Sequence, residues 1–284
     1  MKYSGHESFS IRKNWLQKGI RKIDSFKKSD MEAMDETGLG RNMVKSLRYW
    51  LKAVGITEDE PKKKLFSLSD FGKTVAERDP YIQEIGTLFL LQYNLATNKD
   101  YATSWYFLFN EFNMTEFSEE DFCKSLQNWD EMNNEKKAAS SAFQKDFDCI
   151  RRTYTQAKGE DDPESNMGCP FSELGLLRVN GNGELQKTSP LKKTFPPIVL
   201  YACILKQCGN ASTEIRLSRL QNDRGSVGKA FNMDSILLMS LLGELENKNL
   251  LQVVRTAGLD VVRLKTAMTF EKAVEFYYDQ LGSE

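Results

Sequence analysis

Four basic residues recur at helical spacing in one short segment, and we call them the basic stripe: Arg41, Lys45, Arg48 and Lys52. Offsets of 4, 7 and 11 residues, at about 100° each, place all four within about 60° of arc on one helix face. No Asp or Glu lies between Gly40 and Gly55. Such a face suits DNA phosphates, and Asn42 beside it can reach base edges. The stripe predicts a DNA-binding helix. The alternative is an ordinary solvated helix face, which usually carries acidic residues that form i,i+4 salt bridges with the basic ones.

The chain has a single histidine, His6, which is followed by Glu7. Any Ser-His-Asp triad or histidine-based zinc site would have to include it. A histidine beside a glutamate can titrate near neutrality or bind a divalent ion. His6 and Glu7 are therefore the candidate catalytic residues, and the alternative for His6 is a surface or capping role.

A divalent ion such as Mg²⁺ or Mn²⁺ prefers carboxylate oxygens. Neighbouring carboxylates occur at Asp146/Asp148, at Asp161/Asp162 and at residues 119–121. Acidic runs of this kind are usually solvated faces, so they predict no definite metal site.

Several chemistries have no support in the sequence. The chain contains neither GxxxxGK[ST] nor a GxGxxG turn after a strand, so we expect no nucleotide cofactor. No nuclease signature is visible. The five cysteines include no C-x-x-C pair, and we expect reduced thiols that pack in the interior.

The basic stripe requires a helix over 41–53, and its neighbours predict a winged helix-turn-helix over residues 1–80. We expect helices over 10–26 and 30–35, a hairpin with its tip at 58–64, and a helix from Ser67–Asp70 through Val75. The hairpin tip carries Lys62, Lys63 and Lys64, which could touch phosphates. Arg12 and Lys13 complete the predicted DNA contacts of this module.

The remaining chain divides into two further blocks. Residues 81–185 predict an acidic helical middle domain, with core helices over 81–95 and 103–112 and a linker at 158–168. Residues 186–284 follow a hairpin around 180–183 and predict a second winged helix. Its helices fall at 198–207, 216–220, 234–248 and 269–278, and its wing strands at 250–255 and 259–264. Arg216 and Arg219 are its predicted DNA contacts, although a protein-docking module is an open alternative.

The net charge of −1 over 284 residues hides a segregation along the chain. Lys and Arg outnumber Asp and Glu by 17 to 12 in residues 1–80 and by 12 to 6 in residues 186–265. In residues 81–185 the acidic residues outnumber the basic ones by 18 to 9. Basic blocks on either side of an acidic one suggest that the ends contact nucleic acid. No apolar run approaches the ~20 residues that span a bilayer, and no secretory signal is visible. We expect a cytoplasmic protein without membrane contact and with a mainly α fold.

Several segments resemble a bacterial family catalogued as domain of unknown function 4007. The resemblance rests on GHESF and RKNWLQKG at the start, GLGRNMVKSLRYWLKAVG, Asp79-Pro80-Tyr81, LATNKDYATSWYFLFNEF and FSELGLL, which together span most of residues 1–200. The basic stripe falls inside the GRNMV-S-RYW string.

The resemblance implies an SspB-like component of a DNA phosphorothioation system, which is a bacterial antiphage defence. It implies DNA binding, nicking of the strand to be modified, and other proteins of that system as partners. The residues alone support DNA binding and leave two alternatives open. These are a non-catalytic adaptor that docks partner proteins, and a transcriptional regulator.

Overall fold

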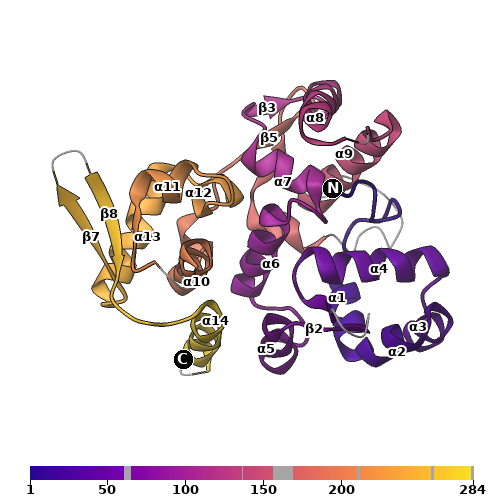
Figure 1. The fold of residues 1–284 in the computed structure, drawn as a ribbon, viewed down its shortest axis with the longest axis horizontal. Helices are drawn as coiled ribbons and strands as arrows, with labels where there is room; N and C mark the ends of the chain where they lie inside the picture. The colour runs from indigo at the N-terminus through magenta and orange to yellow at the C-terminus, as the bar shows by residue number, and fades with distance from the viewer. Residues whose placement is uncertain (61–64, 136, 156–168, 210–211, 257–258, 283–284) are drawn as a thin grey trace.

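The computed structural model describes residues 1–60, 65–135, 137–155, 169–209, 212–256 and 259–282. Within them the chain is mainly helical, as predicted, with three small antiparallel sheets (Figure 1). The predicted linker at 158–168 and the lysines of the hairpin tip at 62–64 lie outside the described residues.

The first block contains the predicted helices and hairpin in the predicted order. Its elements are α1 (Lys13–Arg21), α2 (Ile23–Lys28), α3 (Asp30–Thr37), α4 (Arg41–Ala53), β1 (Thr57–Glu60), β2 (Leu65–Leu68) and α5 (Asp70–Arg78). The single helix expected over 10–26 is wrong, because the chain breaks at Lys22. There the Ser25 hydroxyl donates to the Lys22 carbonyl at 2.7 Å, and such side-chain bonds compete with helix continuation.

Helix α5 crosses the chain entering the hairpin so closely that only glycine fits at position 72. A Cβ atom on Gly72 would lie 1.9 Å from the carbonyl oxygen of Ile56 and 2.9 Å from its carbonyl carbon. Both are backbone atoms, so neither can rotate out of the way.

Gly72→Ala should therefore lower the free energy of unfolding by about 1–3 kcal/mol, the usual cost of overpacking. The matched control is Gly243→Ala, in the helix α13 (Ser235–Asn247). A Cβ there meets open space, so this substitution should raise the free energy of unfolding by roughly 0.5–1 kcal/mol. Urea unfolding followed by circular dichroism measures both. Equal stability of the two variants would contradict the close approach.

The middle block is built around two fully buried helices. Its elements are α6 (Ile85–Thr97), α7 (Thr103–Asn110), β3 (Glu116–Phe117), α8 (Glu119–Asn133), α9 (Ser140–Tyr154), the 3-10 helix η1 (Pro170–Leu174), β4 (Leu177–Val179) and β5 (Leu185–Lys187). Helix α6 starts four residues later than predicted. The Asp79 carboxylate accepts from the backbone N–H groups of Gln83 and Glu84 at 2.9 and 3.1 Å, which fixes residues 80–84 as a turn before the helix.

The acidic residues on both sides of Ser118 belong to regular structure, β3 before it and α8 after it. Strand β3 pairs with β5 to give the sheet order β3-β5-β4. Ser118 and Asp121 then form a reciprocal capping box at the start of α8, which satisfies two backbone donors. The predicted domain boundary after residue 185 falls inside β5.

The last block contains the 3-10 helix η2 (Lys192–Thr194), α10 (Pro197–Cys208), β6 (Glu214–Arg216), α11 (Leu217–Asn222), α12 (Val227–Ala230), α13 (Ser235–Asn247), β7 (Leu251–Thr256), β8 (Leu259–Leu264) and α14 (Phe270–Leu281). The two predicted wing strands pair as expected. Strand β6 joins them in the order β6-β8-β7 and was not predicted. Arg216, expected in a helix, instead ends this strand because it pairs with Val261 of β8.

The three blocks share one contiguous apolar core within the described residues. Helix α14 packs against both α5 and α10, and Arg78 pairs with Asp279 at 2.5 Å; Figure 1 shows α14 beside α5. The five cysteines are free thiols, as predicted. In the described part of the chain no helix is long and apolar enough to cross a membrane.

Candidate functional site

Helix α4 is amphipathic, and packing decides which side faces solvent. Val44, Leu47 and Leu51 are completely buried, so the opposite face carries the basic stripe outward as predicted. Gly40 begins the helix without a side-chain cap, and no acidic residue lies in the first turn. The partial positive charge of the helix N-terminus therefore adds to the side-chain charges there.

The side chains at the N-terminal half of the stripe are available to a ligand. Arg41, Asn42 and Lys45 are exposed, and none of their side chains forms a hydrogen bond or ion pair with another described residue. Two cations, one amide and a helix N-terminus thus point toward solvent together. This arrangement can hold phosphate oxygens and place one amide near a base edge.

The C-terminal half of the stripe is neutralised by partners from other elements. The Arg48 guanidinium pairs with Asp30 of α3 at 3.0 Å, and it also lies over the rings of Phe26 and Phe66. Lys52 pairs with Asp59 of β1. Both carboxylates lie outside the acid-free span between Gly40 and Gly55 and reach the stripe through tertiary packing.

The other predicted DNA contacts are more scattered. Arg12 occupies the N-cap position of α1 without a side-chain capping bond and lies half-buried, with its guanidinium 5.4 Å from the centre of the Trp15 ring. Lys13 begins that helix. Helix α1 packs against α4, so both residues belong to the same module as the stripe. Arg219 is exposed and pairs with Asp223 at 2.7 Å.

Arg216 lines a groove of about 620 Å³ in the C-terminal module, between α11, the start of α13 and β8. Beside this groove Ile236, on the outward side of α13, is 82% exposed. The groove thus has the exposed cation Arg216 in its lining and one exposed apolar side chain beside it, and Figure 1 places the C-terminal module at the opposite end of the molecule from α3.

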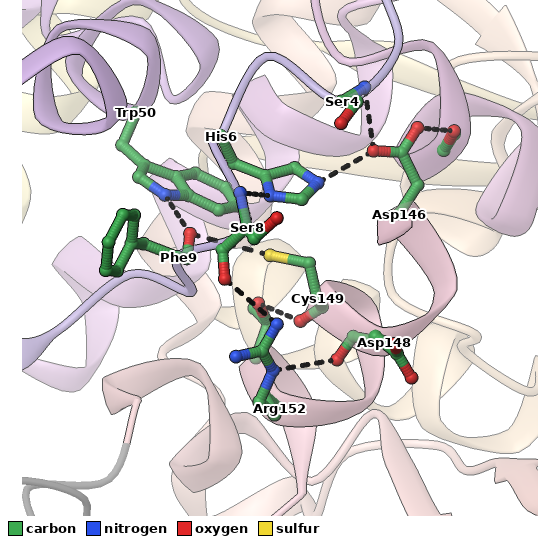
Figure 2. Close-up of polar contacts among 11 residues, drawn as sticks. Ser4, His6, Ser8, Phe9, Trp50, Asp146, Asp148, Cys149 and Arg152 are labelled. Atoms are coloured by element: carbon green, nitrogen blue, oxygen red, sulfur yellow. Dashed lines mark hydrogen bonds and ion pairs between the residues drawn. The ribbon is translucent and has the colours of Figure 1, made fainter. Parts of the chain in front are cut away.

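His6 is completely buried rather than on the surface. Its Nε2 lies 2.7 Å from Asp146 Oδ1, and its Nδ1 accepts the backbone N–H of Ser8 at 3.1 Å (Figure 2). Because Nδ1 accepts, the proton is on Nε2, which donates to Asp146. Both ring nitrogens are therefore used within the protein.

Asp146 is the buried centre of this network. It also accepts from the Ser4 N–H at 2.9 Å and from the Ser104 hydroxyl at 2.6 Å. Sequence reasoning paired it with Asp148, but residues two apart on a helix point to different sides. A signal was present, since Asp146 lies on the apolar face of α9 beside Phe143 and Phe147.

The loop that carries His6 has a strained backbone. Ser4, Glu7 and Ser8 all have positive φ angles, of 51°, 50° and 67°, which non-glycine residues rarely adopt. The loop is held by Trp50 and Cys149, which donate to the Phe9 carbonyl, and by Arg152, which donates to the Ser8 carbonyl (Figure 2). Of the two candidate catalytic residues, only Glu7 is exposed to a substrate in solvent.

The described residues do not form a ready-made metal centre. No three His, Cys, Asp or Glu side chains among them converge on one point. Asp146 accepts a hydrogen bond from His6, and Asp121 accepts one from the Ser118 N–H at the cap of α8. The predicted pair at 161–162 lies outside the described residues.

The chain matches the family described as protein of unknown function (DUF4007) over residues 3–278. Its fold is similar to the crystal structure of magnesium ion-bound SspB, with a TM-score of 0.87, 24% identity, and coverage of 100% of this chain and 89% of that chain. A second SspB crystal structure gives a TM-score of 0.83 and 25% identity, with 99% and 87% covered. No curated protein matches the chain.

Proposed function

The chain belongs to DUF4007, a family of proteins of unknown function, and from this premise we propose that it is a DNA-binding component of a bacterial DNA phosphorothioation system. The observation that carries the proposal is the exposed group Arg41, Asn42 and Lys45 at the uncapped start of α4. The resemblance of its motifs to the family, and the SspB-like fold, supply the biological setting.

The finer fold assignment is part of this proposal. In the first block α3, α4 and the β1–β2 hairpin follow one another as the helices and wing of a winged helix-turn-helix do. In the last block α10, β6, α11, α13 and the β7–β8 hairpin repeat that order, with β6 paired to β8. Helix α4 would then enter a DNA groove, while the C-terminal module contacts the backbone through Arg216 and Arg219.

DNA binding is tested by the salt dependence of affinity for a short duplex. Log K should fall linearly with log salt concentration, with a slope of about −0.9 for each phosphate contacted. Affinity that does not change between 50 and 200 mM salt would rule out binding through the stripe.

Strand nicking, with Mg²⁺ or Mn²⁺, is a separable part of the proposal that rests on the family resemblance. Supercoiled plasmid is incubated with the protein and each metal or EDTA, and the products are resolved on a gel. Metal-dependent conversion to open circles that Glu7→Ala abolishes would support nicking at the strained loop. Intact plasmid together with salt-sensitive binding would leave a DNA-binding protein without this chemistry.

A second candidate function is a non-catalytic adaptor for partner proteins of the same system. The groove lined by Arg216, with the exposed Ile236 beside it, favours it, because concave surfaces are common sites of ligand and partner binding. This candidate gains support if the purified protein neither binds nor nicks DNA.

The two carboxylates that neutralise the stripe should weaken DNA binding. Asp30→Asn and Asp59→Asn free Arg48 and Lys52 from their ion pairs. Each variant should bind DNA several-fold more tightly at low salt and steepen the salt slope by about one. Asp35→Asn, an exposed acid on α3, removes the same charge as a control. If all three variants gain equally, the effect is net charge and not the released cations.

A further inference from the structure

A cluster of two lysines and two tyrosines lies where the C-terminal end of α4 meets the middle block. We call it the lysine–tyrosine cluster: Lys2, Tyr49, Lys52 and Tyr101. The Lys2 ammonium lies 4.1 Å from the centre of the Tyr101 ring and 5.4 Å from that of Tyr49, and Lys52 lies 4.7 Å from the Tyr101 centre. The two rings stack at 5.3 Å with an interplanar angle of 21°.

Three separate segments build the cluster. Tyr49 and Lys52 come from α4, and Tyr101 from the loop between α6 and α7. The Lys2 backbone N–H donates to Thr103 Oγ1 at 2.9 Å, which holds the first residues beside α7 (Figure 1). No local sequence pattern connects these segments, so the cluster exists only in the folded chain.

The cluster leaves positive charge unbalanced. Both ammonium groups lie close to one ring, so the two Nζ atoms are near enough to repel each other. Lys52 has Asp59 as a partner, whereas Lys2 forms no ion pair with any described carboxylate. Burial raises the pKa of the Tyr49 phenol well above its ordinary value, so the tyrosine supplies no neutralising charge. An anion held between the lysines would relieve the repulsion.

The cluster also continues the line of the basic stripe. Lys52 shares the face of Arg41 and Lys45 and lies about 16 Å along the axis from Arg41, at about 1.5 Å per residue. A strand of B-form DNA advances about 3.4 Å along the duplex axis for each phosphate, so the two ends of α4 can contact different phosphates of one duplex. Lys2 and Tyr101 extend the surface from α4 onto the middle block.

We propose that the lysine–tyrosine cluster binds a backbone phosphate of the same DNA strand that crosses the start of α4. This inference rests on the proposed DNA binding and adds a second contact point from a different part of the chain. The tyrosine rings position the two ammonium groups, and the phosphate oxygens accept from both.

The test compares Lys2→Glu with wild type in duplex binding over 50–200 mM salt. We expect weaker binding of every sequence and a salt slope reduced by about one, because one phosphate contact is lost. Lys2→Arg should retain both the affinity and the salt slope. Lys272→Glu changes an exposed residue of α14 and should behave as wild type. Thermal melting of each variant separates loss of contact from loss of folding.

The outcomes separate this inference from the proposed function. If charge reversal at Arg41 and Lys45 abolishes binding while Lys2→Glu behaves as Lys272→Glu does, the cluster proposal is overturned and DNA binding by the stripe stands. If wild type shows no salt-sensitive DNA binding, both fail. Tyr101→Leu keeps both lysines, so weaker binding with an unchanged slope would support the positioning role of the ring, and unchanged affinity would contradict that role.

Discussion

Replacing His6 with alanine should lower the free energy of unfolding by about 3–5 kcal/mol. The substitution removes the His6 donor from the buried Asp146 carboxylate, and breaking a buried pair from one side costs about this much. It also opens a cavity beside Tyr49, Trp50 and Trp105, whose rings surround the imidazole with centroid distances of 5.8–6.2 Å. Urea unfolding followed by tryptophan fluorescence measures the loss directly.

Glu7→Ala is the matched control, because Glu7 is the exposed neighbour of His6. It should change stability by no more than about 0.5 kcal/mol. A His6→Ala variant as stable as Glu7→Ala would show that the pair with Asp146 does not hold the loop. His6 would then be a stronger catalytic candidate than its burial indicates.

Asp146→Ala provides an independent check on the same pair. It should destabilise the protein to a similar extent, since Ser4 and Ser104 lose their acceptor as well. The double variant should cost clearly less than the sum of the single variants, because residues in one hydrogen-bond network are coupled. Full additivity would contradict the network.

Reversing the charge of Arg41 and Lys45 together should produce the largest loss of DNA affinity. Arg41→Glu with Lys45→Glu removes both free cations of the stripe and places carboxylates at the helix N-terminus. We expect binding about 100-fold weaker at 50 mM salt, roughly tenfold for each lost charged contact. The salt slope should fall by about two. Because phosphate contacts carry no sequence information, the loss should be the same for unrelated duplexes.

The control must carry the same change in net charge elsewhere. Lys124→Glu with Lys272→Glu does so on exposed positions of α8 and α14. Fluorescence anisotropy with a labelled duplex compares the two double variants. Equal losses would mean that binding follows net charge, and the start of α4 would then not be the DNA-binding surface.

Local patterns predicted the elements that depend on neighbouring residues. Helix α4 has the predicted bounds, 41–53, because its apolar period and the glycines at both ends are local signals. The β7–β8 hairpin and the start of α14 follow for the same reason. The break at Lys22 and the late start of α6 were missed, because each depends on one side chain, Ser25 or Asp79, that hydrogen-bonds to nearby backbone groups.

Contacts between distant residues could not be predicted in this way. Strands β3 and β6 are too short to show alternation and exist because they pair with β5 and β8. Asp146 lies 140 positions from His6, and Asp30 and Asp59 reach the stripe from other elements. None of these pairings has a fixed sequence spacing.

The sequence by itself determined the mainly helical class, the bounds of α4, the β7–β8 hairpin and the basic face of α4, because each follows from short-range periodicity and steric preference. The tertiary structure alone decided which cations on that face remain free, that the single histidine is buried, and that Lys2 and Tyr101 join the end of α4. The physical reason is that pairing of charges and burial depend on which distant side chains packing brings within a few ångströms.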